Sequence, residues 1–172
     1  ITMRTPGEDV SLVRGLLHSE GIINDAKFLP DIVLKKENKK GIVTIVDVHI
    51  PEDKLGEGYL NSRSLLSVSS CGICGKTELG DLAFIGKTID NNKKIEIGLI
   101  DELFNKMNAH QHDFMESGGT HASAAFSLEG NLLCSMEDIG RHNAVDKVVG
   151  KLIALDKLDQ AKIITVSGRI SY

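Results

Sequence analysis

The sequence has no tryptophan, and aromatic residues make up only 4% of its 172 residues. Stacking platforms for nucleic-acid bases are therefore not evident, because they are built from aromatic side chains. The formal net charge of −4 also argues against a general nucleic-acid or membrane-surface binder, although it is compatible with a local basic pocket. No apolar run approaches the ~18 residues of a membrane span, and no signal peptide is visible. We therefore expect a cytoplasmic protein that binds neither nucleic acid nor membrane.

Cysteine is also scarce, and the three that are present have an uneven spacing that does not make a disulfide framework. Cys71 and Cys74 stand three positions apart in the run SSCGICGK at residues 69–76. The glycines allow backbone conformations that expose a side chain, and the neighbouring lysine favours the reactive thiolate form. By itself this pair fits a redox couple, half of a zinc site or a persulfide carrier.

Zinc is the strongest metal alternative, since Cys71 and Cys74 need only two further ligands for a tetrahedral site. Cys134, His121 and His142 are the candidates for those ligands. However, the sequence has no second Cys-x-x-Cys or His-x₃₋₅-His pair, and Cys134 lies in an apolar run typical of a core residue. We therefore expect no tightly held metal.

The apolar spacing predicts a small α+β part over residues 1–70. Val10, Val13, Leu16 and Leu17 recur at helical spacing after a Thr-Pro-Gly-Glu run at 5–8 that reads as a capping box. β-Branched runs at 31–37 and 42–50 predict a hairpin, and 65–70 a short strand.

Residues 71–172 predict a three-layer α/β domain. The expected elements are a helix over 99–115, strands over 122–128 and 132–136, a helix from Arg141, and a strand over 161–166. Because the second helix allows a crossover connection to the last strand, we expect a mixed sheet.

Three polar motifs lie at the boundaries of these elements: GGTH at 118–121, EDIGRHN at 137–143 and SGR at 167–169. Paired glycines give backbone N–H groups close access to a ligand, and arginines suit bidentate phosphate contacts. Together they predict a pocket for a phosphate-bearing ligand, with Asn143, Asp138 or Asp146 free to read polar edges. A plain turn at the glycines, a helix cap at Asp138 and structural histidines are the alternatives.

The cysteine run, GGTHA at 118–122, EDIGRHNAVDK at 137–147 and SGRIS at 167–171 recur here in an order that resembles the formate dehydrogenase accessory protein family, FdhD/NarQ. The resemblance covers essentially the whole chain. It implies a homodimer whose α/β domain is similar in fold to cytidine deaminases. Deaminase chemistry is not expected, because Asn143 and Ala144 follow His142 where a zinc deaminase needs His-x-Glu. Family members continue beyond the last motif, so we expect that part of the pocket is missing at the C-terminus.

The resemblance also implies a function, that of a sulfurtransferase. Cys71, assisted by Cys74, would accept sulfur as a persulfide from a cysteine desulfurase. The protein would pass it to the molybdenum or tungsten bis(pterin guanine dinucleotide) cofactor of formate dehydrogenase. The residues expected around that cofactor are Gly118, Gly119, Thr120, His121, Arg141, His142, Asn143, Ser167, Gly168 and Arg169. The alternative function is a cofactor-binding chaperone without sulfur chemistry.

Overall fold

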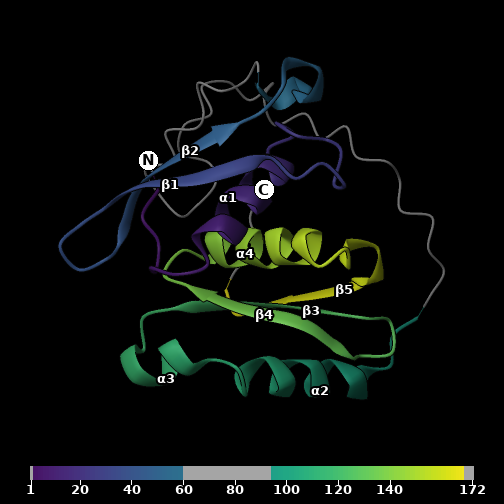
Figure 1. Ribbon diagram of the computed structural model, residues 1–172. Coiled ribbons are helices and arrows are strands. Elements are labelled where there is room, and N and C mark those ends of the chain that lie inside the picture. Colours follow the sequence, from purple (N-terminus) through teal and green to yellow (C-terminus); the bar gives the residue numbers. More distant parts are fainter. Residues whose placement is uncertain (1, 60–93, 169–172) are drawn as a thin grey trace, which may run out of the picture.

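The computed structural model describes residues 2–59 and 94–168 (Figure 1). Its helices and strands, in chain order, are α1 (Asp9–Ser19), β1 (Asp31–Glu37), β2 (Val43–His49), α2 (Ile97–Asn108), α3 (His112–Ser117), β3 (His121–Phe126), β4 (Leu132–Asp138), α4 (Arg141–Ala154) and β5 (Ile163–Val166). The cysteine loop, the strand expected at 65–70, the expected domain boundary at residue 70 and Arg169 all lie outside the described residues. None of the described helices is long and apolar enough to cross a bilayer.

The layers stack in a simple order (Figure 1). One face of the sheet β4-β3-β5 is covered by α2 and α3, and the other by α4. Beyond α4 lie α1, which packs directly on it, and the β1–β2 hairpin. The expected α/β class is therefore present, with a small helix-and-hairpin part added at the N-terminus.

The sheet corrects one expectation, because all of its described strands pair antiparallel, whereas a mixed sheet was expected. The crossover through α4 does exist, and it carries the chain from β4 to β5. However, it passes over β3, so that β5 pairs with the free edge of β3 and not with β4. Since β3 runs opposite to both neighbours, every ladder is antiparallel.

Strand β3 lies at the centre and divides the core in two, because successive side chains of a strand point to opposite faces. Its even-numbered residues pack against α2 in a cluster of Ala122, Ala124, Phe126, Leu103 and Met107. Its odd-numbered residues face α4, where Ala125 packs with Val148 and Leu152. This alternation decides which polar side chains meet at the end of the sheet where β3 begins.

The helix expected over 99–115 is two helices. The chain turns between α2 and α3, where the His110 N–H donates to the Met107 carbonyl and the Gln111 N–H to that of Asn108. A separate helix then starts because the Glu137 carboxylate of β4 accepts the N–H groups of Asp113 and Phe114, each at 2.8 Å. The apolar spacing stops at Met107 and resumes at Phe114, seven positions further on, so the expectation of one helix carried it across the polar residues between them.

The predicted capping box at 5–8 is also wrong. Helix α1 begins at Asp9, and Glu8 precedes it in a left-handed conformation, with φ of 53° and no side-chain cap. Thr5 instead binds the other end of the molecule. Its hydroxyl accepts the Ile139 N–H at 2.9 Å, and its own N–H donates to Asp138 at 3.1 Å. A contact with residues more than 130 positions away outweighed the local motif.

Candidate functional site

Three of the predicted site residues meet where β3 begins, β5 ends and α4 starts. A Cβ atom placed on Gly168 would lie 3.2 Å from His121 Nδ1 and 3.5 Å from Arg141 Cδ. A side chain here would require the His121 imidazole to move by a few tenths of an ångström, so glycine suits the close passage of the segment after β5 beside the imidazole and the arginine stem. His121 and Arg141 are half-buried, and both lie on the face of the sheet that carries α4.

Ser167 joins this group through the backbone of β3. Its hydroxyl oxygen accepts the Ala122 N–H at 2.9 Å and lies 3.5 Å from His121 Nδ1. Its own N–H donates to the Ala122 carbonyl at 2.9 Å, which extends the β3–β5 ladder by one residue. The end of β5 is thus fixed against the start of β3, with the imidazole beside it.

This cluster of His121, Arg141, Ser167 and Gly168 is suited to an anionic ligand. Arg141 is the first residue of the 14-residue helix α4, whose N-cap is Gly140 and has no side chain to cap the first turn. The amide dipoles of a helix favour negative charge at this end, and a guanidinium adds a planar set of hydrogen-bond donors. The arrangement can therefore hold a phosphate or carboxylate group.

The loop at 118–120 lies on the other face of the sheet, beside α3. Gly118 and Gly119 are exposed; Gly118 adopts a positive φ of 64° and ends α3. Thr120 is half-buried, and its hydroxyl donates to Glu137 Oε1 at 2.8 Å. Since Glu137 also binds the start of α3, one carboxylate fixes both ends of the segment 113–120. Sequence reasoning gave Glu137 no role, because nothing in the sequence distinguishes its carboxylate from that of the adjacent Asp138.

Asp138 was expected either to be free for a ligand or to cap the helix that follows, and the structure shows that it is not free. It is fully buried and forms an ion pair with Lys147 Nζ at 2.8 Å. The Lys147 side chain is itself only 3% exposed. Its other oxygen accepts the Gly140 N–H and the Asn143 amide, each at 2.9 Å. Asn143 donates in addition to the Met3 carbonyl at 2.8 Å. Asp138 and the Asn143 amide nitrogen therefore hold the start of α4 and the N-terminal segment in place.

Asp146 is not free to read a ligand either. It lies in the contact between α1 and α4, accepts a hydrogen bond from the Ser19 hydroxyl at 2.8 Å, and is 8% exposed. Burial raises the pKa of its carboxyl group to about 7, and the nearby charge of Glu20 acts in the same direction.

Cys134 is half-buried and packs against the core, close to the expected core position. It packs against the α4 side of the sheet, and its Sγ lies 3.8 Å from the Val148 carbonyl. Burial raises the pKa of this thiol to about 11, which keeps it protonated and unreactive at neutral pH.

Cys134 and His121 do not converge on one metal ion. Cys134 pairs with Ala125 in the β3–β4 ladder, four positions along β3 from His121, which corresponds to about 13 Å. Within residues 2–59 and 94–168, no three histidine, cysteine or carboxylate side chains gather as ligands. Cys71 and Cys74 lie outside those residues.

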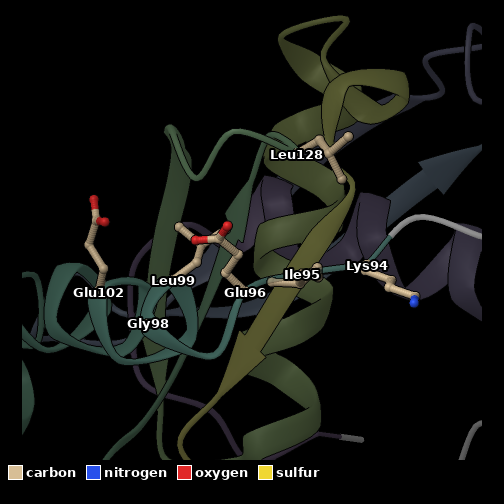
Figure 2. A pocket seen from close by; sticks show the side chains of 7 residues that line it. All are labelled: Lys94, Ile95, Glu96, Gly98, Leu99, Glu102 and Leu128. Carbon is tan, nitrogen blue, oxygen red and sulfur yellow. The ribbon is translucent and has the colours of Figure 1, made fainter.

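A cavity of about 410 Å³ opens at the opposite end of the β3–β4 hairpin, at the start of α2. Figure 2 shows Glu102 and Lys94 on opposite sides of it, with the aliphatic side chains Leu99 and Leu128 between. Its two carboxylates, Glu96 and Glu102, would repel a phosphate. The side-chain chemistry therefore favours the cluster around His121 as the ligand site, although that cluster does not line this cavity.

Of the ten predicted pocket residues, the structure brings together His121, Arg141, Ser167 and Gly168. It places Gly118, Gly119 and Thr120 next to them along the chain but on the α3 side. His142 and Asn143 lie in the first turn of α4. Their roles toward a ligand stay predictions.

The comparisons with known proteins agree with the family resemblance. The model of the FdhD/NarQ family matches residues 1–172. The chain is 37% identical to the sulfur carrier protein FdhD of Streptomyces avermitilis, over 100% of the chain and 64% of that protein. It is 39% identical to the sulfur carrier protein FdhD of Saccharolobus solfataricus and 40% to that of Thermoplasma volcanium, in both cases over 100% of the chain and 62% of the relative. The chain thus spans somewhat less than two thirds of the length of these relatives.

A crystal structure of a candidate formate dehydrogenase accessory protein from Desulfotalea psychrophila has a similar fold. The TM-score is 0.60 at 18% identity, and the match covers 97% of this chain and 59% of the other. At this identity the likeness concerns the fold alone. The family match over the full length and the curated relatives decide the assignment: the chain belongs to the FdhD/NarQ family.

Proposed function

We propose that this chain is a sulfurtransferase that carries sulfur to a molybdenum or tungsten bis(pterin guanine dinucleotide) cofactor destined for formate dehydrogenase. The names of the curated relatives, sulfur carrier protein FdhD, support the sulfur-carrying role. The observation that carries the proposal is the packing of His121 and Arg141 around Gly168, at the positive end of α4. This cluster supplies cationic and hydrogen-bonding groups for the diphosphate of a guanine nucleotide end.

The sulfur chemistry belongs to Cys71 and Cys74. The Cys71 thiolate attacks the outer sulfur of a persulfide on the cysteine desulfurase, the donor's S–S bond breaks, and the donor leaves as a thiolate. Attack by the Cys74 thiolate on the inner sulfur of the Cys71 persulfide then releases the outer sulfur as hydrosulfide. This step leaves a Cys71–Cys74 disulfide, which a cellular dithiol reduces before the next cycle.

The proposal includes further elements that the family resemblance implies. The sulfur donor is a cysteine desulfurase, and the client is formate dehydrogenase. The protein acts in the cytoplasm as a homodimer in a cytidine deaminase-like fold. The bound cofactor is substrate, so the protein itself needs no resident metal.

Intact-protein mass spectrometry after incubation with a cysteine desulfurase and cysteine tests the sulfur chemistry. We expect the unmodified protein to gain one sulfur that a reductant removes. Cys71→Ala should abolish this gain. Cys134→Ala is the matched control and should keep it, because the pKa of about 11 and partial burial make Cys134 a poor nucleophile.

The other outcomes point to the alternatives. A gain that depends on Cys134 would contradict the assignment of Cys71. No gain, together with retained binding of GDP, would replace the sulfurtransferase by a cofactor-binding chaperone. No gain, with zinc bound in a native mass spectrum, would give Cys71 and Cys74 a structural role.

A further inference from the structure

The Glu137 carboxylate binds the Thr120 hydroxyl and fixes its orientation. This carboxylate makes three hydrogen bonds. Its Oε1 accepts the Phe114 N–H and the Thr120 hydroxyl, and its Oε2 accepts the Asp113 N–H, all at 2.8 Å. These three bonds come from both ends of the segment 113–120, so the Thr120 side chain is held in one orientation.

A threonine hydroxyl has one proton and two acceptor lone pairs, whereas a carboxylate has only acceptors. The proton in the bond between Thr120 and Glu137 therefore comes from Thr120. Toward any further partner the hydroxyl can only accept. Phosphate oxygens without a proton also only accept, so they are not suitable partners for this group.

Thr120 is close in the chain to the cluster that favours anions. It directly precedes His121, is half-buried, and lies on the opposite face of the sheet from the imidazole. The start of β3 thus presents two different surfaces, with cationic and donor groups on the α4 side and an acceptor hydroxyl on the α3 side.

We propose that Thr120, oriented by Glu137, is a specificity-determining residue that accepts a hydrogen bond from the sugar or base of the nucleotide, and that phosphate contacts fall to Arg141 and His121. This inference rests on the proposed function, since it concerns how the same site reads its ligand. Thr120 would touch the ligand directly, whereas Glu137 acts through Thr120 as a positioning residue.

Equilibrium binding of GDP and four analogues to the full-length protein tests the inference. The analogues are 2′-deoxy-GDP, 3′-deoxy-GDP, IDP and N1-methyl-GDP, and each lacks one donor of the sugar or of the guanine base. We expect Thr120→Val to weaken GDP binding about fivefold to tenfold, as for the loss of one hydrogen bond. One analogue should bind the unmodified protein more weakly by the same factor and lose nothing further in Thr120→Val.

Two other variants separate this role from a structural one. Thr120→Ser keeps the hydroxyl and should restore GDP affinity to within about twofold. Thr44→Val is the matched control, because it removes a hydroxyl that donates to the Lys36 carbonyl at 3.1 Å in the β1–β2 hairpin, and it should leave affinity unchanged.

The outcomes distinguish this inference from the proposed function. GDP binding that is insensitive to Thr120→Val would overturn the role of Thr120 and leave the cofactor site intact. An equal loss for GDP and all four analogues would assign the effect to the phosphates or to folding, and would also overturn it. If the unmodified protein has no affinity for GDP, both proposals fail.

Discussion

Asp146 shows how one buried group shapes the stability of this protein. Its carboxyl group lies between α1 and α4, where Ser19 is its hydrogen-bond partner and Glu20 contributes a like charge. Burial disfavours the ionised form, so the pKa rises from 3.8 to about 7. Between these two values the folded protein binds a proton that the unfolded chain releases. The free energy of unfolding should therefore fall as the pH rises from about 4 to about 7.

We predict that Asp146→Asn removes this pH dependence. At pH 8 the variant should be more stable than the unmodified protein, by at most about 4 kcal/mol for a pKa shift of this size, while at pH 4 the two should be similar. Urea unfolding at both pH values measures the difference. Asp101→Asn, at an exposed position on α2, should show no such gain. Parallel pH profiles for the Asp146 variant and the unmodified protein would contradict the prediction.

At the scale of elements, two glycines set the distance between α1 and α4. A Cβ atom on Gly150 would lie 1.8 Å from the Ser11 carbonyl oxygen, and one on Gly15 would lie 1.8 Å from the Asp146 carbonyl oxygen. Each helix therefore presents a glycine to the backbone of the other. This contact attaches the N-terminal helix α1 to α4, the helix that carries Arg141 of the candidate ligand site.

Gly150→Ala should therefore destabilise the protein by about 3 kcal/mol or more, because the added methyl group forces the two backbones apart. Gly98→Ala provides the matched control on α2, where a Cβ atom would meet nothing within 4 Å. In this variant the free energy of unfolding should rise by about 0.5–1 kcal/mol, because alanine has a higher helix propensity than glycine. Thermal unfolding of both variants checks the contrast. Equal effects would mean that α1 and α4 do not pack as closely as described.

At the scale of the whole molecule, a buried ion pair joins the N-terminal segment to the start of α4, beside the candidate ligand site. Lys147 Nζ binds Asp138, the Thr5 carbonyl at 3.0 Å and the Glu137 carbonyl at 3.2 Å. The same carboxylate of Asp138 accepts the Thr5 N–H and the Asn143 amide. The first residues of the chain are thus held against the start of α4, and Arg4 next to them donates to the Val43 carbonyl of β2.

We predict that Lys147→Met lowers the free energy of unfolding by about 3–5 kcal/mol, because it leaves the Asp138 carboxylate buried without its countercharge. Loss of the contact with Thr5 should also speed tryptic cleavage after Arg4 under native conditions. Lys151→Met is the matched control, one turn further along α4. It removes a half-exposed ion pair with Glu8 and should cost less than about 1 kcal/mol. Similar losses in the two variants would count against a special role for the buried pair.

Much of the secondary structure could be predicted from the sequence. The hairpin at 31–49, the strands around residue 130 and the helix that starts at Arg141 have strong apolar patterns and turn residues at their ends, and the structure confirms them. Motif order alone also identified the family, which the comparisons confirm. Local patterns were sufficient here because these elements form where their own residues favour them.

What the sequence could not determine depends on contacts between distant residues. The break between α2 and α3 depends on a contact with Glu137. The position of Thr5 depends on its contact with Asp138, and the position of β5 depends on its pairing with β3. For the same reason the sequence offered Asp138 and Asp146 as groups free to contact a ligand, although both are buried. The type of a side chain determines which hydrogen bonds and ion pairs it can form, whereas the fold determines which of these it forms within the protein. Only the tertiary structure therefore decided that His121, Arg141, Ser167 and Gly168 come together.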